Sequence, residues 1–323
     1  MGKLLARRLM QFPLVVAVIY TVTFVLIVTA PGDPLTGADT KLSAQTLKLL
    51  RAQYGLDKPW YVRYGDYAWN FASSATHGEL NLGKSLYYSD KPVAEVMGLT
   101  AGTWHDGAMR TSLTLGLLSL GLAVLVGVNV GVWSAVRQNS LADHVALAAT
   151  LVGVSLPTFV TGAMLIWLFA LAIPILPGGG WGSVPTLVLP TLTLSLPFMA
   201  YIARLMRAGM LDVLNADYVR TARAKGLGER TVIYKHAFKL AFLPVLSYLG
   251  PAAAAILTGS FVVEQLFDVP GIGRHFVLSV MNRDQPLVIG TVLVYAVLLV
   301  SFNLLVDMAY MLVDPRISRE EAV

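Results

Sequence analysis

Long uncharged runs dominate the hydrophobic pattern of this chain. A helix needs about 20 apolar residues to cross a bilayer, and four runs without Asp, Glu, Lys or Arg approach or exceed that length. They are residues 9–30, 111–136, 240–263 and 286–306. A fifth uncharged run, 145–203, is too long for one crossing, and its Pro- and Gly-rich middle, 174–182, predicts a turn between two spans. The pattern therefore predicts an all-α integral membrane protein with six transmembrane helices.

Helix-breaking residues fall inside the predicted central spans. They are Pro157, Pro190, Pro197 and the neighbours Gly250 and Pro251. Transmembrane helices tolerate such residues because neighbouring helices can satisfy the freed backbone groups. Taken together on spans three to five, these residues indicate a moving core and not a static anchor.

The positions of Lys and Arg predict the orientation. They lie at the N-terminus, at Arg137, between Arg204 and Lys239, and at the C-terminus, whereas the short connections on the other side hold only Arg274 and Arg283. Basic residues favour the cytosolic side of short loops, so both termini are expected in the cytosol. The predicted division is 1–30, N-terminus and first span; 31–110, extracytoplasmic segment; 111–312, membrane core with five helices and a cytosolic loop at 204–239; and 313–323, cytosolic tail.

Composition agrees with a membrane protein. The chain is 56% hydrophobic and 13% charged, with a mean hydropathy of +0.66, whereas soluble domains carry roughly 25% charged residues. It has no cysteine, which excludes disulfides, thiol catalysis and cysteine metal sites. The net charge of +5 gathers in the predicted cytosolic segments, so the expected partner is the bilayer and not nucleic acid.

No catalytic or cofactor pattern is present in the sequence. The chain lacks the Gly-x4-Gly-Lys-Ser/Thr phosphate-binding loop, and its five histidines fall in five separate segments, without the pair spacing of a metal site. A membrane enzyme would need an acid, base or metal set that the sequence does not offer. A stand-alone secondary transporter or channel would need charges at mid-membrane, and the predicted spans carry none.

The outward segment 31–110 has two recognisable helices. Ser43 is placed to cap a helix that ends near Gly55. A second helix follows Pro59 and carries an aromatic stripe, Trp60, Tyr64, Tyr67 and Phe71. Such a stripe is typical of a helix at the membrane interface, and the alternative is a cap over the outer mouth that touches a substrate or a delivery protein.

A basic, helix-prone segment from Asp217 to Arg230 lies in the predicted cytosolic loop. Its apolar flank consists of Tyr218, Val219, Ala222, Ala224 and Leu227. That flank favours docking onto a soluble partner, and the alternative is a basic loop that only anchors two spans.

Several motifs, read together, resemble the permeases of oligopeptide/dipeptide ABC importers, and in particular their first permease type. The motifs are the segment 218–227 (YVRTARAKGL), 31–34 (PGDP), 54–59 (YGLDKP), 269–273 (VPGIG) and 314–317 (DPRI). They follow the order of that family and cover most of the chain. The resemblance implies a type I ABC-importer permease-like fold and a subunit that moves peptides by alternating access, with nickel, glutathione or another small solute as alternatives.

The resemblance also implies partners and a coupling site. The partners are a second homologous permease, two cytosolic ABC ATPase subunits that carry ATP and Mg²⁺, and an extracytoplasmic peptide-binding protein; no cofactor is expected on this chain. The residues implied to contact an ATPase subunit are Asp217, Tyr218, Arg220, Thr221, Ala222, Arg223, Ala224, Lys225, Gly226 and Leu227. Gly226 is expected to end the coupling helix, and the small Ala222 and Ala224 to permit close approach.

The segment departs from the general coupling-loop pattern at several positions. Arg220 stands in place of a Glu and Thr221 in place of an Ala, and residues 236–239 replace an Ile-x-Leu-Pro. The departures leave open which side chain makes the strongest contact.

Overall fold

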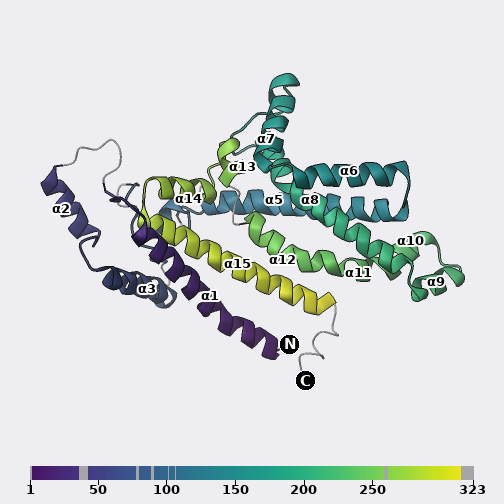
Figure 1. The fold of residues 1–323 in the computed structure, drawn as a ribbon, viewed down its shortest axis with the longest axis horizontal. Helices are drawn as coiled ribbons and strands as arrows, with labels where there is room; N and C mark the ends of the chain where they lie inside the picture. Colours follow the sequence, from purple (N-terminus) through teal and green to yellow (C-terminus); the bar gives the residue numbers. More distant parts are fainter. Residues whose placement is uncertain are drawn as a thin grey trace. The chain divides into compact units, whose positions relative to one another are not determined.

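The computed structural model describes residues 2–35, 43–77, 80–88, 91–100, 102–105, 107–257 and 261–313. In this part of the chain the regular elements are helices (Figure 1), and the β-structure is a single isolated bridge between Lys84 and Pro92. The chain divides into two compact units. Unit 1 comprises Met1–Leu5, Thr114–Val269 and Leu299–Val323, and unit 2 comprises Ala6–Leu113 and Pro270–Leu298.

Unit 1 contains most of the membrane core. Two long helices, α5 (Ala108–Val136) and α15 (Gln285–Val313), begin in unit 2 and continue into unit 1. The other elements of unit 1 are α6 (Leu141–Ser155), α7 (Thr158–Ile166), the π-helix η1 (Trp167–Ala172), α8 (Val184–Leu214), α9 (Asp217–Ala224), α10 (Glu229–Thr231), the π-helix η2 (Val232–Ala237), α11 (Phe238–Ala241), α12 (Leu243–Leu257) and α13 (Phe261–Leu266).

The described helices contain up to six candidate membrane spans. Four are single helices, at Met10–Thr29, Ala108–Val136, Val184–Leu214 and Gln285–Val306. Two more are bent pairs, Leu141–Ser155 with Thr158–Ala172 and Glu229–Ala241 with Leu243–Leu257. The expected number is reached when each bent pair counts as one span, and residues 173–183 form the expected non-helical connection before α8.

The third span is broken instead of straight. Its two halves meet at 108° (Figure 1), between Leu156 and Pro157. Pro157 has no N–H to donate to the preceding turn, and Leu156 is extended with ψ of 130°, as a residue before proline prefers. By contrast, Pro190 and Pro197 lie within a continuous α8. Of the predicted breakers, Pro157 is therefore the one that ends a helix outright.

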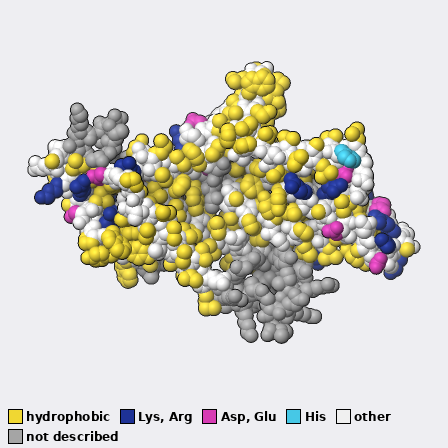
Figure 2. Space-filling view, viewed as in Figure 1, with side chains coloured by type: hydrophobic (Ala, Val, Ile, Leu, Met, Phe, Trp, Pro, Cys, Tyr) yellow, Lys and Arg dark blue, Asp and Glu magenta, His cyan; other side chains and the backbone are white. Residues whose placement is uncertain are grey.

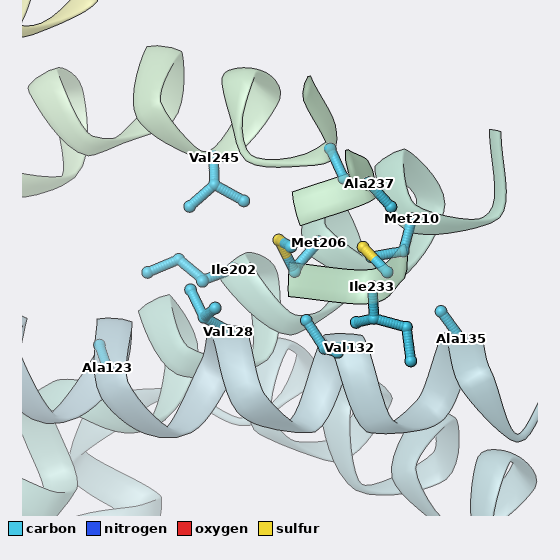
Figure 3. Packing of buried hydrophobic residues seen from close by; sticks show 11 residues of the cluster. Ala123, Val128, Val132, Ala135, Ile202, Met206, Met210, Ile233, Ala237 and Val245 are labelled. Atoms are coloured by element: carbon cyan, nitrogen blue, oxygen red, sulfur yellow. The ribbon is translucent and has the colours of Figure 1, made fainter. Parts of the chain in front are cut away.

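Glycines allow α5 and α8 to pack closely at the centre of unit 1. A Cβ on Gly127 would lie 2.7 Å from the carbonyl oxygen of Met199, and one on Gly131 would lie 2.6 Å from that of Ala203. The two glycines are four residues apart and share one helix face, which is the small-residue spacing of closely packed membrane helices. The adjoining core (Figure 3) is built from α5, α8, η2, α11 and α12, and its buried residues are Ala123, Val128, Val132, Ala135, Ile202, Met206, Met210, Ile233, Ala237, Ala241 and Val245.

Unit 2 holds the outward segment together with the first helix. Its elements are α1 (Gly2–Thr29) from Ala6 onward, α2 (Ala44–Gln53), α3 (Trp60–His77), α4 (Val93–Val96), α14 (Ile272–Met281) and the first parts of α5 and α15. The predicted cap is present, because the Ser43 side chain accepts a hydrogen bond from the Thr46 N–H. Gly55 follows the end of α2 with φ of +64°, as expected of a terminating glycine.

The aromatic stripe on α3 is a packing face. Tyr64, Tyr67 and Phe71 pack in one cluster with buried Tyr20 and Phe24 of α1. The Tyr20 hydroxyl donates a 2.7 Å hydrogen bond to the Tyr64 carbonyl oxygen. The stripe was expected to face the membrane interface or the outer mouth, but contact with α1 explains three of its four aromatic residues.

Candidate coupling site

Helix α9 has a well-defined end at Gly226. The Gly226 N–H donates to the Arg223 carbonyl at 2.9 Å, and the Leu227 N–H donates to the Ala222 carbonyl at 3.4 Å. Gly226 has φ of +78°, in the left-handed region that glycine adopts without steric cost. This pair of hydrogen bonds is the Schellman motif, so the prediction that Gly226 ends the helix is confirmed.

The apolar flank of α9 contains both buried and exposed side chains. Val219 and Ala222 are buried, and they form a cluster with Val232 of η2. Val213 and Leu214 at the end of α8 pack against the same cluster. The sequence placed Val219 and Ala222 on the docking flank; that was wrong, because both side chains hold α9 against its own chain.

The other residues predicted to contact an ATPase subunit lie on the exposed surface of α9 and its C-terminal turn. They are Asp217, Tyr218, Arg220, Thr221, Arg223, Ala224, Lys225, Gly226 and Leu227. Figure 2 shows Lys and Arg side chains at the end of unit 1 where α9 and α10 lie. Partial burial raises the pKa of the Tyr218 phenol, so this hydroxyl stays neutral and can donate a hydrogen bond. The exposed surface therefore offers mainly basic and hydroxyl groups, with Ala224 as its small residue.

Arg223 connects α9 to the segments on both sides of it. Its Nε donates to Glu229 Oε1 of α10 at 2.8 Å, and its Nη1 donates to the Leu214 carbonyl of α8 at 3.3 Å. The Arg220–Asp217 pair, by contrast, is 3.6 Å long and largely exposed, and such pairs contribute little. Of these two arginines, Arg223 therefore stabilises the position of α9, whereas the guanidinium of Arg220 remains exposed to solvent.

A buried ion pair lies further back along α8. Arg207 donates from Nε and Nη2 to the two carboxylate oxygens of Asp143, each at 2.7 Å. Ser134 of α5 donates to Asp143 Oδ1, and the Asn139 N–H donates to Oδ2 at 2.9 Å. Asp143 is fully buried, so these four donors replace the water it has lost. We call Ser134, Asp143 and Arg207 the ion-pair cluster; it joins α5, α6 and α8.

The sequence reasoning missed the ion-pair cluster. It assigned Arg207 to the loop 204–239, but α8 continues to Leu214, so the first third of that segment is helix. One signal was available: Ser140 caps α6 by accepting from the Asp143 N–H at 3.2 Å, and a Ser followed three residues later by an acid is a helix-start pattern. That pattern places Asp143 in a first turn but does not identify Arg207 as its partner.

The cluster and α9 are connected through one continuous helix. Arg207 lies two turns before the end of α8, and Leu214 at that end packs against the cluster of Val219, Ala222 and Val232. Helix α8 therefore joins the packing of α9 to the ion-pair cluster directly. Within the residues that the structure describes, no group of three metal-ligating side chains occurs.

Comparisons with known proteins identify the family. Residues 127–319 match the family described as "Binding-protein-dependent transport system inner membrane component", and residues 1–90 match "Binding-prot-dependent transport system membrane comp, N-term". The chain belongs to this family of inner-membrane transport components. The resemblance inferred from the motifs is therefore confirmed: the protein is a multi-pass inner-membrane transport subunit, all-α, with the type I importer permease as its fold class.

Curated relatives match almost end to end. The oligopeptide transport system permease protein OppB of Salmonella typhimurium is 37% identical over 98% of this chain and 99% of its own. The dipeptide transport system permease protein DppB of Bacillus subtilis is 36% identical over 98% of each chain. Among solved structures, a crystal structure of an amino acid ABC transporter with histidines matches with a TM-score of 0.46 and 20% identity, covering 66% of this chain and 97% of that one.

Proposed function

We propose that this chain is the membrane-spanning permease subunit of an ATP-driven importer that moves di- and oligopeptides across the cytoplasmic membrane. The observation that carries the proposal is the end-to-end similarity to peptide permeases, at 37% identity over 98% of the chain. The expected partners are a second homologous permease, two cytosolic ATPase subunits that bind ATP and Mg²⁺, and an extracytoplasmic peptide-binding protein.

In this proposal α9 is the coupling helix. The exposed Tyr218, Arg220, Thr221, Ala224 and Lys225 contact a groove on an ATPase subunit. The basic side chains meet acidic groups at the rim of the groove, and Ala224 allows close approach. The buried residues of α9 and the Schellman turn keep the helix rigid, so that closure of the ATPase pair is transmitted as a push on α8.

The transport cycle follows from that push. ATP-driven closure turns the solute cavity outward toward the binding protein, and hydrolysis resets it. The break at Pro157 and the 52° bend between α11 and α12 are places where the spans can change shape without breaking a regular helix. The orientation that this requires puts both termini and α9 in the cytosol and residues 31–110 outside, in accord with the distribution of Lys and Arg.

The solute class follows from the chemistry of the spans. The predicted spans carry no charge at mid-depth, and a metal ion would need a ligand cage that the described residues do not form. A passage lined by apolar, hydroxyl and backbone groups suits peptides with varied side chains.

The direct test is reconstitution of the complete importer in vesicles with its own binding protein. Uptake of labelled di- to pentapeptides that requires both ATP and the binding protein would support the proposal. Uptake of nickel or glutathione without any peptide uptake would show that the importer carries one of the alternative solutes instead. Peptide uptake by this chain alone, driven by an ion gradient, would instead make it a secondary transporter.

A further inference from the structure

An apolar groove of about 620 Å³ lies in unit 1 between α5, α6 and α8. Its walls include Val130, Val145, Ala149, Leu196 and Met199, and the only hydroxyl among its lining side chains is that of Thr150. Its volume is that of a small-molecule site, which typically measures about 300–1,000 Å³.

One end of the groove is formed by an aromatic residue with a cation above it. Trp133 lines the groove, and the guanidinium carbon of Arg137 lies 5.1 Å from the centre of its ring. Trp133 also lines a second hollow of about 500 Å³, together with Arg230 and Tyr234. Trp133 is therefore shared by the groove and the second hollow, and it brings exposed Arg137 and Arg230 to this end of the groove, on the side of unit 1 that the proposed orientation places in the cytosol.

These two arginines carry unpaired charge in the part of the chain that the structure describes. In the described part of the chain, neither Arg137 nor Arg230 forms an ion pair. The acids nearest to these arginines in sequence are already engaged, because Asp143 is held by Arg207, and Glu229, the neighbour of Arg230, is held by Arg223. The end of the groove is consequently positive and complementary to an anion.

We infer that this groove binds an anionic phospholipid of the cytosolic leaflet. The lipid phosphate lies between Arg137 and Arg230, and one acyl chain runs along the groove past Ala149. Basic residues between transmembrane helices on the cytosolic side are suited to anionic headgroups. Trp133 and Tyr234 occupy the level where aromatic side chains prefer to meet the membrane–water interface. The inference does not depend on which solute the protein transports.

The other possible occupants fit less well. A transmembrane helix is about 10 Å wide and about 30 Å long, far larger than the groove. A peptide would bring backbone N–H and C=O groups to walls with a single hydroxyl, and each unsatisfied group would cost several kcal/mol. An acyl chain brings no polar group, and the headgroup finds its partners at the arginines.

The test measures phospholipids retained by the purified full-length chain, by native mass spectrometry after incubation with phosphatidylglycerol or phosphatidylcholine. The wild type should retain one phosphatidylglycerol and at least about fivefold less phosphatidylcholine. Arg137→Gln with Arg230→Gln should lose that preference, whereas Lys235→Gln with Lys239→Gln, which removes the same charge from exposed residues lining neither hollow, should keep it. Equal retention by the two double variants would overturn the inference, as would equal binding of the two lipids by the wild type.

A second pair of variants tests the acyl-chain path. Ala149→Trp fills the groove and should reduce phosphatidylglycerol retention at least about fivefold, whereas Ala148→Trp, an exposed neighbour that does not line the groove, should not. In this cysteine-free chain, a single cysteine introduced by Ala149→Cys also allows the molecule that occupies the groove to be identified by cross-linking. Cross-linking to a phospholipid with a photoreactive acyl chain supports the inference; high-yield cross-linking to the second permease or to a transported peptide contradicts it.

Discussion

Arg207 holds Asp143 with two parallel hydrogen bonds of 2.7 Å that cross from α8 to α6. The pair is separated by 64 residues in sequence, and Asp143 is fully buried, whereas the Arg207 side chain is 20% exposed. A bidentate pair fixes the relative rotation of the two helices as well as their distance. Because the chain continues from the end of α8 into α9, the proposed coupling would pass from α9 to the membrane core through the helix that holds this pair.

Removing one partner of this pair should destabilise the chain strongly. Arg207→Gln leaves the Asp143 carboxylate buried without its main partner, and such losses typically cost about 3–5 kcal/mol. The double variant Asp143→Asn with Arg207→Gln should cost less than Arg207→Gln alone, since no charge is then left buried. Thermal unfolding of the purified chain in detergent measures both. A loss in the double variant equal to the sum of the losses in Arg207→Gln and Asp143→Asn would contradict a direct interaction.

The close contact of α5 with α8 should depend on Gly131. Gly131→Leu places a side chain against Ala203 and Met206, where even a Cβ would lie 2.6 Å from existing atoms. We expect a loss of at least about 1–3 kcal/mol from overpacking. Gly121→Leu is the matched control on the same helix, because no atom lies within 4 Å of its Cβ position. Equal melting temperatures for the two variants would show that the helices are not in close contact there.

The proposed orientation can be tested with single cysteines in this cysteine-free chain. Ser74 is a poor position for the outward label, because its side chain is buried and hydrogen-bonded to the Asn70 carbonyl and the Asn81 N–H. Leu49 on α2 is 66% exposed, and Thr231 is exposed on the other side of the predicted membrane. A membrane-impermeant thiol reagent should label Leu49→Cys in intact cells and Thr231→Cys only after the membrane is opened. The reverse labelling pattern would show that the chain has the opposite orientation in the membrane.

Two alanines on α9 should respond differently to the same substitution. Ala222→Glu forces a carboxylate into the buried cluster with Val219 and Val232, so it should loosen α9 and lower the stability of the cytosolic segment by several kcal/mol. Ala224→Glu places the charge on the exposed surface and should leave the melting temperature unchanged. If α9 docks with an ATPase subunit through this surface, Ala224→Glu should still weaken that binding. The measurement is a pull-down of ATPase subunits with the folded Ala224→Glu variant. If this variant recovers as much ATPase subunit as the wild type does, α9 does not dock through this surface.

The sequence predicted the features that depend on local patterns. Apolar runs located the spans, and Gly226 was identified as a helix end because the left-handed conformation favours glycine. The inward orientation of Val219 and Ala222 could not be predicted, because it depends on Val232, which reaches α9 only after the chain turns back. The Arg207–Asp143 pair was missed for the same reason, since neither residue's own neighbourhood identifies its distant partner. The contact at Gly127 and Gly131 could have been suspected from their spacing alone.

The role of α9 as the coupling helix is tested most directly by comparing Gly226→Val with Gly228→Val. Neither glycine has an atom within 4 Å of its Cβ position, but Gly226 has φ of +78° and Gly228 has φ of −65°. A valine at Gly226 must therefore adopt a strained backbone or open the Schellman turn, at a cost of about 1–3 kcal/mol, whereas one at Gly228 need not.

The measurement is ATP-driven solute uptake and ATP hydrolysis by the reconstituted importer carrying each variant. The account predicts that Gly228→Val transports at near the wild-type rate, and that Gly226→Val inserts normally but loses at least about tenfold in uptake, through failure to bind the ATPase subunits or through hydrolysis without transport. Wild-type uptake by Gly226→Val at equal protein levels would contradict the account and leave α9 as a topological anchor.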